Sequence, residues 1–95
     1  MRNYEVAFIA HPELDEAAFA ALVEKAQGWV TAAGGQVVKT DIWGRRRLAY
    51  PIRKQNEGQY VLLETQLEGS ATREIERNLR LTEQVMRFQI VRTDA

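Results

Sequence analysis

The stretch from Val37 to Ile52 limits most strongly what this chain can fold into. Apolar and polar residues alternate along it, apart from an interruption at Gly44, and such a period of two is typical of a half-buried β-strand. Pro51 cannot donate a hydrogen bond to a neighbouring strand, so we expect an edge strand or its frayed end. After the interruption one face of this strand carries Leu48, Tyr50 and Ile52, and the other carries Arg47, Ala49 and Arg53.

Positive charge gathers in the second half of this stretch. The whole chain has 13 basic and 13 acidic residues, but residues 42–56 contain five basic and no acidic ones. The five are Arg45, Arg46, Arg47, Arg53 and Lys54. A local surplus of this kind predicts a surface that meets an anionic partner. The alternative is a solvated basic hairpin that only protects a sheet edge, with Arg53 simply flanking a turn.

The first third of the chain predicts a strand followed by a helix. Residues 2–10 alternate with mostly apolar residues on both faces, which favours a central strand. Asp15 is the expected N-cap of a helix whose apolar residues recur every three or four positions up to Ala33. Gly34 and Gly35 then provide a left-handed stop.

The last part of the chain predicts a hairpin, a second helix and a final strand. Residues 53–58 are polar and end in glycine, which favours a hairpin loop before a strand over residues 59–67. Ser70 is the expected N-cap of a helix whose inner stripe contains Ile75 and Leu79. A turn over residues 81–84 leads to a strand over residues 85–92, and residues 93–95 form a short tail.

The predicted element order is strand, helix, strand, strand, helix, strand. Two right-handed strand–helix–strand units of this order give a four-stranded antiparallel sheet with two helices on one face. The predicted fold is therefore α+β, of the ferredoxin-like split βαβ type. In this arrangement the first and third strands are central, and the size of 95 residues suits one domain spanning residues 1–95.

Several kinds of chemistry have no support in the sequence. There is no cysteine, and His11 is the only histidine, so we expect no metal site, no cofactor and no catalytic residues. Gly34-Gly35 precedes a strand and lacks the geometry of a phosphate-binding loop. No segment is apolar for long enough to span a bilayer, and the amino terminus does not look like a signal peptide, so we expect a cytoplasmic protein without a membrane partner.

The sequence resembles one known family over its whole length. The resemblance is carried by the segments 43–52 (Trp-Gly-Arg-Arg-Arg-Leu-Ala-Tyr-Pro-Ile), 1–5, 12–15 and 79–81. These segments are similar to those of the bacterial small-subunit (30S) ribosomal protein number six family. The resemblance implies a structural, non-enzymatic ribosomal protein. It also implies binding to the central domain of small-subunit ribosomal RNA as a heterodimer with the small basic ribosomal protein number eighteen, and no small-molecule substrate.

The resemblance also implies site residues. The ribosomal RNA candidates are Arg2, Lys54, Arg80 and Arg87, and we expect Arg2 and Arg87 to lie near each other on the first and fourth strands. A further set, Arg45, Arg46 and Arg47, is assigned to contact with either the RNA or the partner protein. Leu48 and Tyr50 are the candidates for the protein interface, and packing of Tyr50 against its own sheet is the alternative.

Two other function classes are compatible with a fold of this type. One is a dimeric ferredoxin-like regulatory domain that senses a small molecule and pairs through its edge strands. The other is a small hydrolase of the acylphosphatase type, which needs an anion-binding loop after its first strand. At that position the chain has His11-Pro12-Glu13, which places an acidic residue there.

Overall fold

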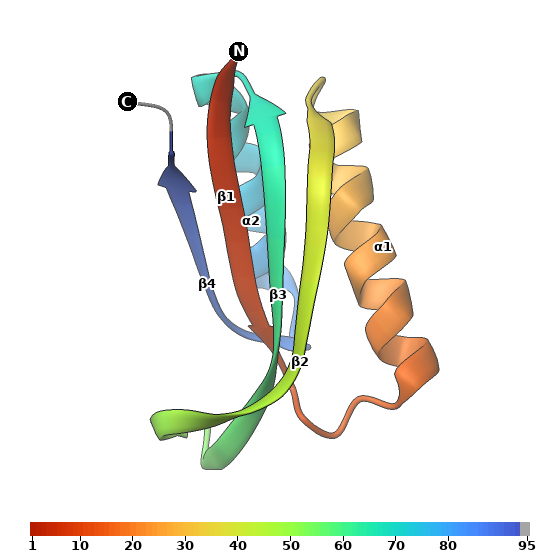
Figure 1. Ribbon diagram of the computed structural model, residues 1–95, viewed down its shortest axis with the longest axis vertical. Helices are drawn as coiled ribbons and strands as arrows, with labels where there is room; N and C mark the ends of the chain where they lie inside the picture. The colour runs from red at the N-terminus through yellow and green to blue at the C-terminus, as the bar shows by residue number, and fades with distance from the viewer. Residues whose placement is uncertain (94–95) are drawn as a thin grey trace.

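Four antiparallel strands and two α-helices form the molecule, shown in Figure 1 as a computed structural model whose described residues are 1–93. The elements in chain order are β1 (Arg2–Ala10), α1 (Glu16–Ala32), β2 (Gln36–Ile52), β3 (Gln55–Leu67), a 3-10 turn (Gly69–Ala71), α2 (Thr72–Leu81) and β4 (Val85–Arg92). The strand order in the sheet is β2-β3-β1-β4. The predicted ferredoxin-like fold is confirmed, with β1 and β3 central and β2 and β4 at the edges.

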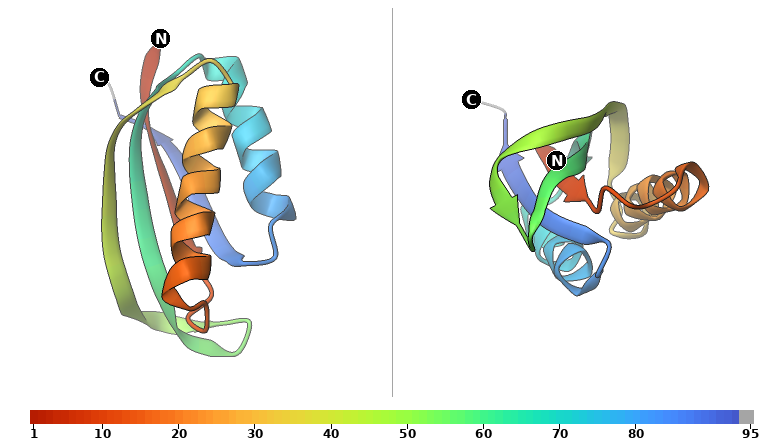
Figure 2. Two further views of the ribbon diagram at one scale, coloured as in Figure 1. Left: turned by 90° about the vertical axis from the view of Figure 1, so that its right-hand side faces the viewer. Right: turned by 90° about the horizontal axis from the view of Figure 1, so that it is seen from below.

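The two helices cover one face of the sheet and leave the other face open, as the side view in Figure 2 shows. The buried apolar side chains between the layers come from both helices and from every strand except β2, for example Phe8, Leu22, Leu63, Ile75 and Val85. The residues of β3 that face the helices are all buried, namely Val61, Leu63, Thr65 and Leu67. The hydroxyl of Thr65, the polar one among them, donates a hydrogen bond to the carbonyl of Tyr4 at 2.9 Å. The open face is thus the broad surface on which a site can form.

Helix α1 begins and ends as predicted. The Asp15 side chain accepts a hydrogen bond from the Ala18 amide at 2.7 Å, which satisfies one of the free N–H groups of the first turn. At the other end Gly34 has a φ of 84°, a left-handed conformation that glycine adopts without a steric penalty.

Helix α2 begins differently from the prediction. The chain enters it through the 3-10 turn, and the N-cap is Ala71, without a side-chain hydrogen bond, so the prediction of Ser70 was wrong. Thr72 instead donates its hydroxyl proton to the carbonyl of Gly69 at 2.8 Å, which stabilises the 3-10 turn. The inner stripe is confirmed, since Ile75 and Leu79 are buried.

The β2–β3 hairpin is longer and more tightly connected than predicted. Gly44 has a φ of 78° at a shift in the strand register, which confirms the predicted interruption as a β-bulge. The predicted loop over residues 53–58 is wrong, because β3 already begins at Gln55. Only Arg53 and Lys54 form the turn, with φ angles of 51° and 65°, as in a two-residue type I′ hairpin.

The far end of this hairpin leaves the plane of the sheet. It bends toward the side of β4, as Figure 1 shows at the lower left. At the opposite end of the sheet the Thr93 amide donates to the carbonyl of Asn3 at 2.9 Å. The rest of the predicted tail, Asp94 and Ala95, lies outside the described residues. None of the helices within residues 1–93 is both long and apolar enough to cross a membrane.

Candidate nucleic-acid interface

The first arginine of the basic run is held by the protein itself. Arg45 donates a hydrogen bond from Nη2 to the carbonyl of Pro12 at 2.6 Å. Its Nη1 lies 3.5 Å from the carboxylate of Glu57, across the hairpin. Arg45 therefore joins β2, β3 and the segment after β1, and it has fewer donors left for a ligand than its neighbours.

Three other cations of the hairpin remain exposed to solvent. Arg46, Arg47 and Lys54 are all exposed, and within residues 1–93 none of them forms an ion pair with a carboxylate. Arg47 and Lys54 border the same shallow hollow, together with Pro12 and residues 55–57. Arg46 makes one long hydrogen bond, of 3.4 Å, to the carbonyl of Arg45. The end of the hairpin thus presents guanidinium and ammonium groups to solvent.

A fourth cation lies on the open face of the sheet, where it meets Tyr50. Arg87 of β4 donates a hydrogen bond from Nη1 to the Tyr50 hydroxyl. Its guanidinium carbon also lies 5.6 Å from the centre of the Tyr50 ring, within the range of a cation–π interaction. The bent hairpin therefore brings a predicted RNA residue and a predicted protein-interface residue into direct contact, although they are far apart in the sequence.

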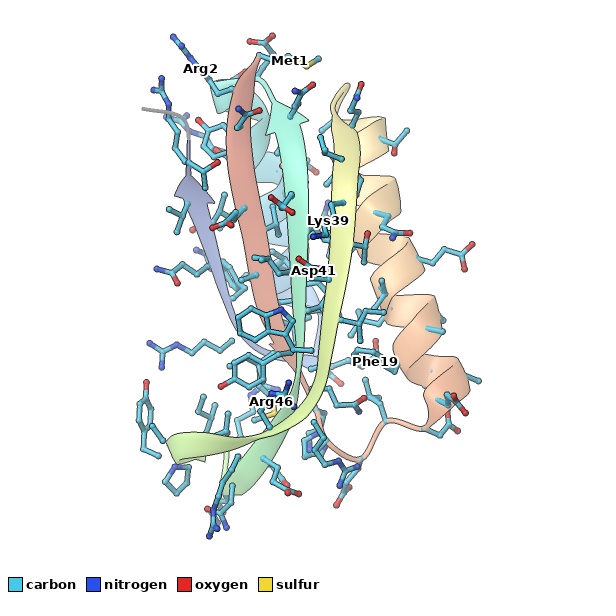
Figure 3. All side chains as sticks on the ribbon, in the orientation of Figure 1. Met1, Arg2, Phe19, Lys39, Asp41 and Arg46 are labelled. Carbon is cyan, nitrogen blue, oxygen red and sulfur yellow. The ribbon has the colours of Figure 1, made fainter. Side chains whose placement is uncertain are left out.

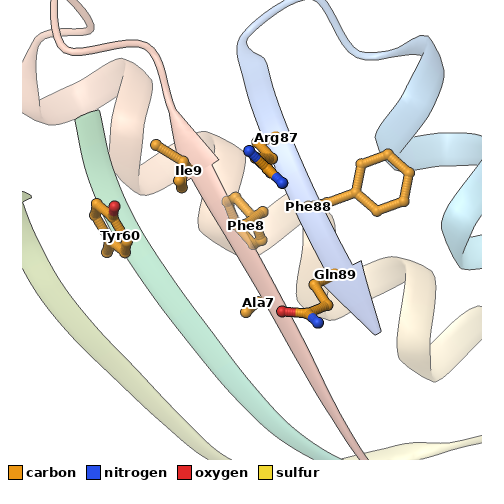
Figure 4. Close-up of a pocket in the computed structure, with 7 residues that line it drawn as sticks. All are labelled: Ala7, Phe8, Ile9, Tyr60, Arg87, Phe88 and Gln89. Carbon is orange, nitrogen blue, oxygen red and sulfur yellow. The ribbon is translucent and has the colours of Figure 1, made fainter. Parts of the chain in front are cut away.

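The open face beside this pair is hollowed and partly apolar. Figure 4 shows residues that line a hollow on β1, β3 and β4, among them Ile9, Tyr60 and Arg87. An adjoining hollow is lined by residues that include Leu48 and Tyr50. Both candidates for the protein interface are therefore accessible at the rim of an apolar surface, and Tyr50 is 55% exposed.

The stacking of two aromatic residues on the open face was not predicted from the sequence. The rings of Trp43 and Tyr60 lie 6.1 Å apart, with an angle of 7° between their planes, and Trp43 is 51% exposed. The bulge at Gly44 shifts the register of β2, so strict alternation did not identify Trp43 as a neighbour of Tyr60.

The remaining RNA candidates, Arg2 and Arg80, lie apart from the hairpin. Arg80, in the last turn of α2, pairs with Glu76 at 2.5 Å, and its guanidinium carbon lies 5.9 Å from the centre of the Phe88 ring. Arg2 is exposed at the start of β1, at the upper end of Figure 3.

The predicted proximity of Arg2 and Arg87 is wrong. Arg87 pairs with Ile9 near the end of β1, whereas Arg2 lies at its beginning. At about 3.4 Å per residue the two positions are separated by roughly 24 Å along the strand. Because β4 runs antiparallel to β1, it is Arg92, opposite Tyr4, that comes close to the start of β1.

Arg53 was also underestimated, since it does more than flank a turn. Its Nη1 donates to the carbonyl of Glu83 at 2.8 Å, and its Nη2 donates to the carbonyl of Val85 at 3.3 Å. Since backbone carbonyls occur at every residue, no sequence signal marks these acceptors. Within residues 1–93 no three His, Cys, Asp or Glu side chains gather closely enough to hold a metal ion.

Comparison with known proteins identifies the family. The family model described as "Ribosomal protein S6" matches residues 3–92. The small ribosomal subunit protein bS6 of Clostridium novyi is 50% identical over 91 residues, which cover 96% of each chain. The bS6 protein of Moorella thermoacetica is 44% identical over 94 residues, covering 99% of this chain and 96% of the relative.

A solved structure agrees with this assignment. The crystal structure of 30S ribosomal protein S6 from Thermotoga maritima superposes with a TM-score of 0.92 at 33% sequence identity, covering 96% of this chain and 86% of the other. The relatives are small ribosomal subunit proteins, which act in the cytoplasm, and they are not enzymes. The match of the family model over residues 3–92 and the identity of 50% to a full-length relative show that this chain belongs to the ribosomal protein S6 family of the small ribosomal subunit.

Proposed function

We propose that this protein binds the central domain of small-subunit ribosomal RNA, cooperatively with ribosomal protein number eighteen. The observation that carries the proposal is the group of three exposed cations at the hairpin end, Arg46, Arg47 and Lys54, which have no carboxylate partner within residues 1–93. Folded RNA offers phosphates at irregular spacing, and such a group binds them without a base-reading motif.

The RNA-binding set follows the family pattern. It contains Arg2, Lys54, Arg80, Arg87, Arg45, Arg46 and Arg47. These residues differ in how many of their hydrogen-bond donors remain available for RNA. Arg46 and Arg47 present guanidinium groups without a carboxylate partner within residues 1–93, and such groups bind phosphate oxygens bidentately. Arg45 contributes only the donors that Pro12 and Glu57 leave unused, and Arg80 only those that Glu76 leaves unused.

The partner protein contacts Leu48 and Tyr50 at the rim of the open-face hollow. Tyr50 combines a large exposed ring with a hydroxyl group, which suits a protein interface. Because Tyr50 also holds Arg87, a partner that orders Tyr50 orders a phosphate-binding group at the same time. This shared contact gives a physical reason for cooperative binding of RNA and partner.

The test is a binding experiment with a central-domain RNA fragment, with and without ribosomal protein number eighteen, at several salt concentrations. We expect weak binding by this protein alone, because its net charge is zero and it neutralises few phosphates. We expect tighter binding with the partner, weakening as salt rises. Equally tight binding without the partner would contradict the proposal, and so would an affinity that does not depend on salt.

Variants test the proposed partner interface separately from RNA binding. Leu48→Ala and Tyr50→Ala should weaken the binding of the partner protein in the absence of RNA. A matched control is Val38→Ala, which changes an exposed residue of the same strand, 59% accessible, far from the hairpin end. If the control weakens partner binding as much as Tyr50→Ala does, the interface lies elsewhere.

A further inference from the structure

The end of the β2–β3 hairpin is poorly held by strand pairing. The last regular pair is Arg47 with Glu57, and the next is Ile52 with Gln55. Between these pairs β2 has the four residues Leu48–Pro51, whereas β3 has only Asn56. Pro51 also has no amide proton to donate. The ladder therefore does not determine how this part of the hairpin is oriented.

The turn at the hairpin tip is not stabilised by its own residues. Both Arg53 and Lys54 have positive φ angles, 51° and 65°. Turns of this type favour asparagine and glycine at these positions, because glycine has no β-carbon to clash and the short polar side chain of asparagine tolerates the left-handed conformation. Such a conformation persists where contacts from elsewhere in the fold maintain it.

The contact that reaches the tip from elsewhere is the fork of Arg53. Its two terminal nitrogens donate to the carbonyls of Glu83 and Val85, at 2.8 and 3.3 Å, on either side of the point where β4 begins. The view from below in Figure 2 shows the hairpin end lying across β4. The hydrogen bond from Arg87 to Tyr50 joins the same two elements.

We propose that Arg53 is a positioning residue that clasps the hairpin tip to the start of β4 and so sets the orientation of both proposed binding surfaces. Lys54, the adjacent residue, belongs to the RNA surface, and Tyr50, three residues earlier, belongs to the partner interface. With both terminal nitrogens already bound to carbonyls, the fork of Arg53 is not open for bidentate binding of a phosphate. The consequence for binding rests on the proposed function, whereas the clasp itself does not.

The first experiment measures the clasp in the free protein. Arg53→Ala removes the fork and the charge, and Arg53→Lys keeps the charge but cannot reach both carbonyls. By NMR we expect amide exchange at residues 52 and 55 to accelerate about tenfold in both variants, together with shifts of the backbone signals of Glu83 and Val85. The matched controls Arg46→Ala and Arg46→Lys should leave both regions unchanged. If the Arg53 variants behave like the Arg46 variants, the clasp does not exist.

The second experiment measures binding of the central-domain RNA with ribosomal protein number eighteen, at a temperature where every variant is fully folded. We expect both Arg53 variants to lose affinity by about three- to tenfold while the slope of log affinity against log salt stays that of the wild type. The proposal would be overturned if Arg53→Lys binds like the wild type and Arg53→Ala lowers the salt slope by about one. That combination would show that Arg53 contacts a phosphate directly. If the wild type itself does not bind the RNA, the proposed function fails while the exchange data still decide the clasp.

Discussion

Replacing Gly58 by alanine tests how closely the hairpin approaches the central strand. Gly58 is buried in β3, opposite Arg46 and just beyond the point where β1 ends. A β-carbon at this position would lie 2.3 Å from Cγ2 of Ile9 and 3.7 Å from Cδ2 of Leu48. The missing side chain thus allows the bent hairpin to lie close to the open face.

The expected effect follows from two opposing terms. Gly58 does not have a positive φ, so alanine fits the backbone and by itself should stabilise the protein by about 0.4–1 kcal/mol. The contact with Ile9 is about 1 Å shorter than ordinary van der Waals contact, and overpacking of this kind costs about 1–3 kcal/mol. Because Ile9 is β-branched, its Cγ2 cannot swing away cheaply. We therefore expect Gly58→Ala to destabilise the protein by about 1–2 kcal/mol.

Thermal and urea unfolding followed by circular dichroism measure this change. For a domain of this size we expect the Tm of Gly58→Ala to fall by about 5–15 °C. The matched control is Gly28→Ala in the exposed part of α1, where the added carbon meets no atom within 4 Å other than its chain neighbours and the adjacent backbone of its own helix. There alanine should stabilise the protein by about 0.5–1 kcal/mol.

A double-mutant cycle with Ile9→Ala isolates the contact. Ile9→Ala removes Cγ2, so Gly58→Ala should cost less in that background than in the wild type, by about 1 kcal/mol or more. If Gly58→Ala is as stable as the wild type, or if the two changes are additive, the steric reasoning is refuted.

Three further changes test other parts of the structure. Asp15→Ala removes the side chain that accepts a hydrogen bond from the Ala18 amide. It should lower the free energy of unfolding by about 1 kcal/mol and the Tm by about 4–8 °C, and an unchanged Tm would mean that the cap contributes nothing. Leu63→Ala empties a site that is 0% exposed and should cost about 2–5 kcal/mol in urea unfolding, and a loss below 1 kcal/mol would contradict the core assignment. Arg47→Ala should weaken RNA binding and reduce its salt slope by about one, whereas Arg73→Ala, on the exposed side of α2, should change neither.

The fold was predictable because hydrophobic periodicity and the central-strand pattern agree along the whole chain. β1 is apolar on both faces and lies in the middle of the sheet, and Pro51 lies on an edge strand, as the physics of strand pairing requires. The Asp15 cap and the stop at Gly34 were predictable for the same reason, since both depend on local backbone chemistry.

The errors arose where tertiary contacts override local preference. Ser70 has the better intrinsic capping chemistry, but the chain enters α2 through a 3-10 turn that leaves Ala71 at the cap. The segment 53–58 is polar and ends in glycine, yet the turn itself comprises Arg53 and Lys54, residues that rarely have positive φ angles. Residue preferences alone would not place a two-residue turn there.

The candidate site shows a further limit of prediction from sequence, because identical charged residues can have different contacts in the fold. Residues 45–47 are three identical side chains in a row, and the sequence treats them as one basic cluster. In the structure Arg45 is tied to Pro12 and Glu57, whereas Arg46 and Arg47 remain exposed without a carboxylate partner within residues 1–93. Strand alternation would place Arg45 and Arg47 on the same face, so it is the proximity of Pro12 and Glu57 to Arg45 that distinguishes these residues.

The same division applies to the end of the basic segment, and it changes how the charge surplus is understood. Arg53 holds the hairpin to β4 through backbone carbonyls, while the adjacent Lys54 is exposed. All five cations between residues 42 and 56 are exposed, but Arg45 and Arg53 also donate hydrogen bonds to backbone carbonyls of other segments. The structural interpretation of this basic segment therefore applies mainly to Arg45 and Arg53, and the proposed RNA binding mainly to Arg46, Arg47 and Lys54, to which Arg45 adds only its unused donors.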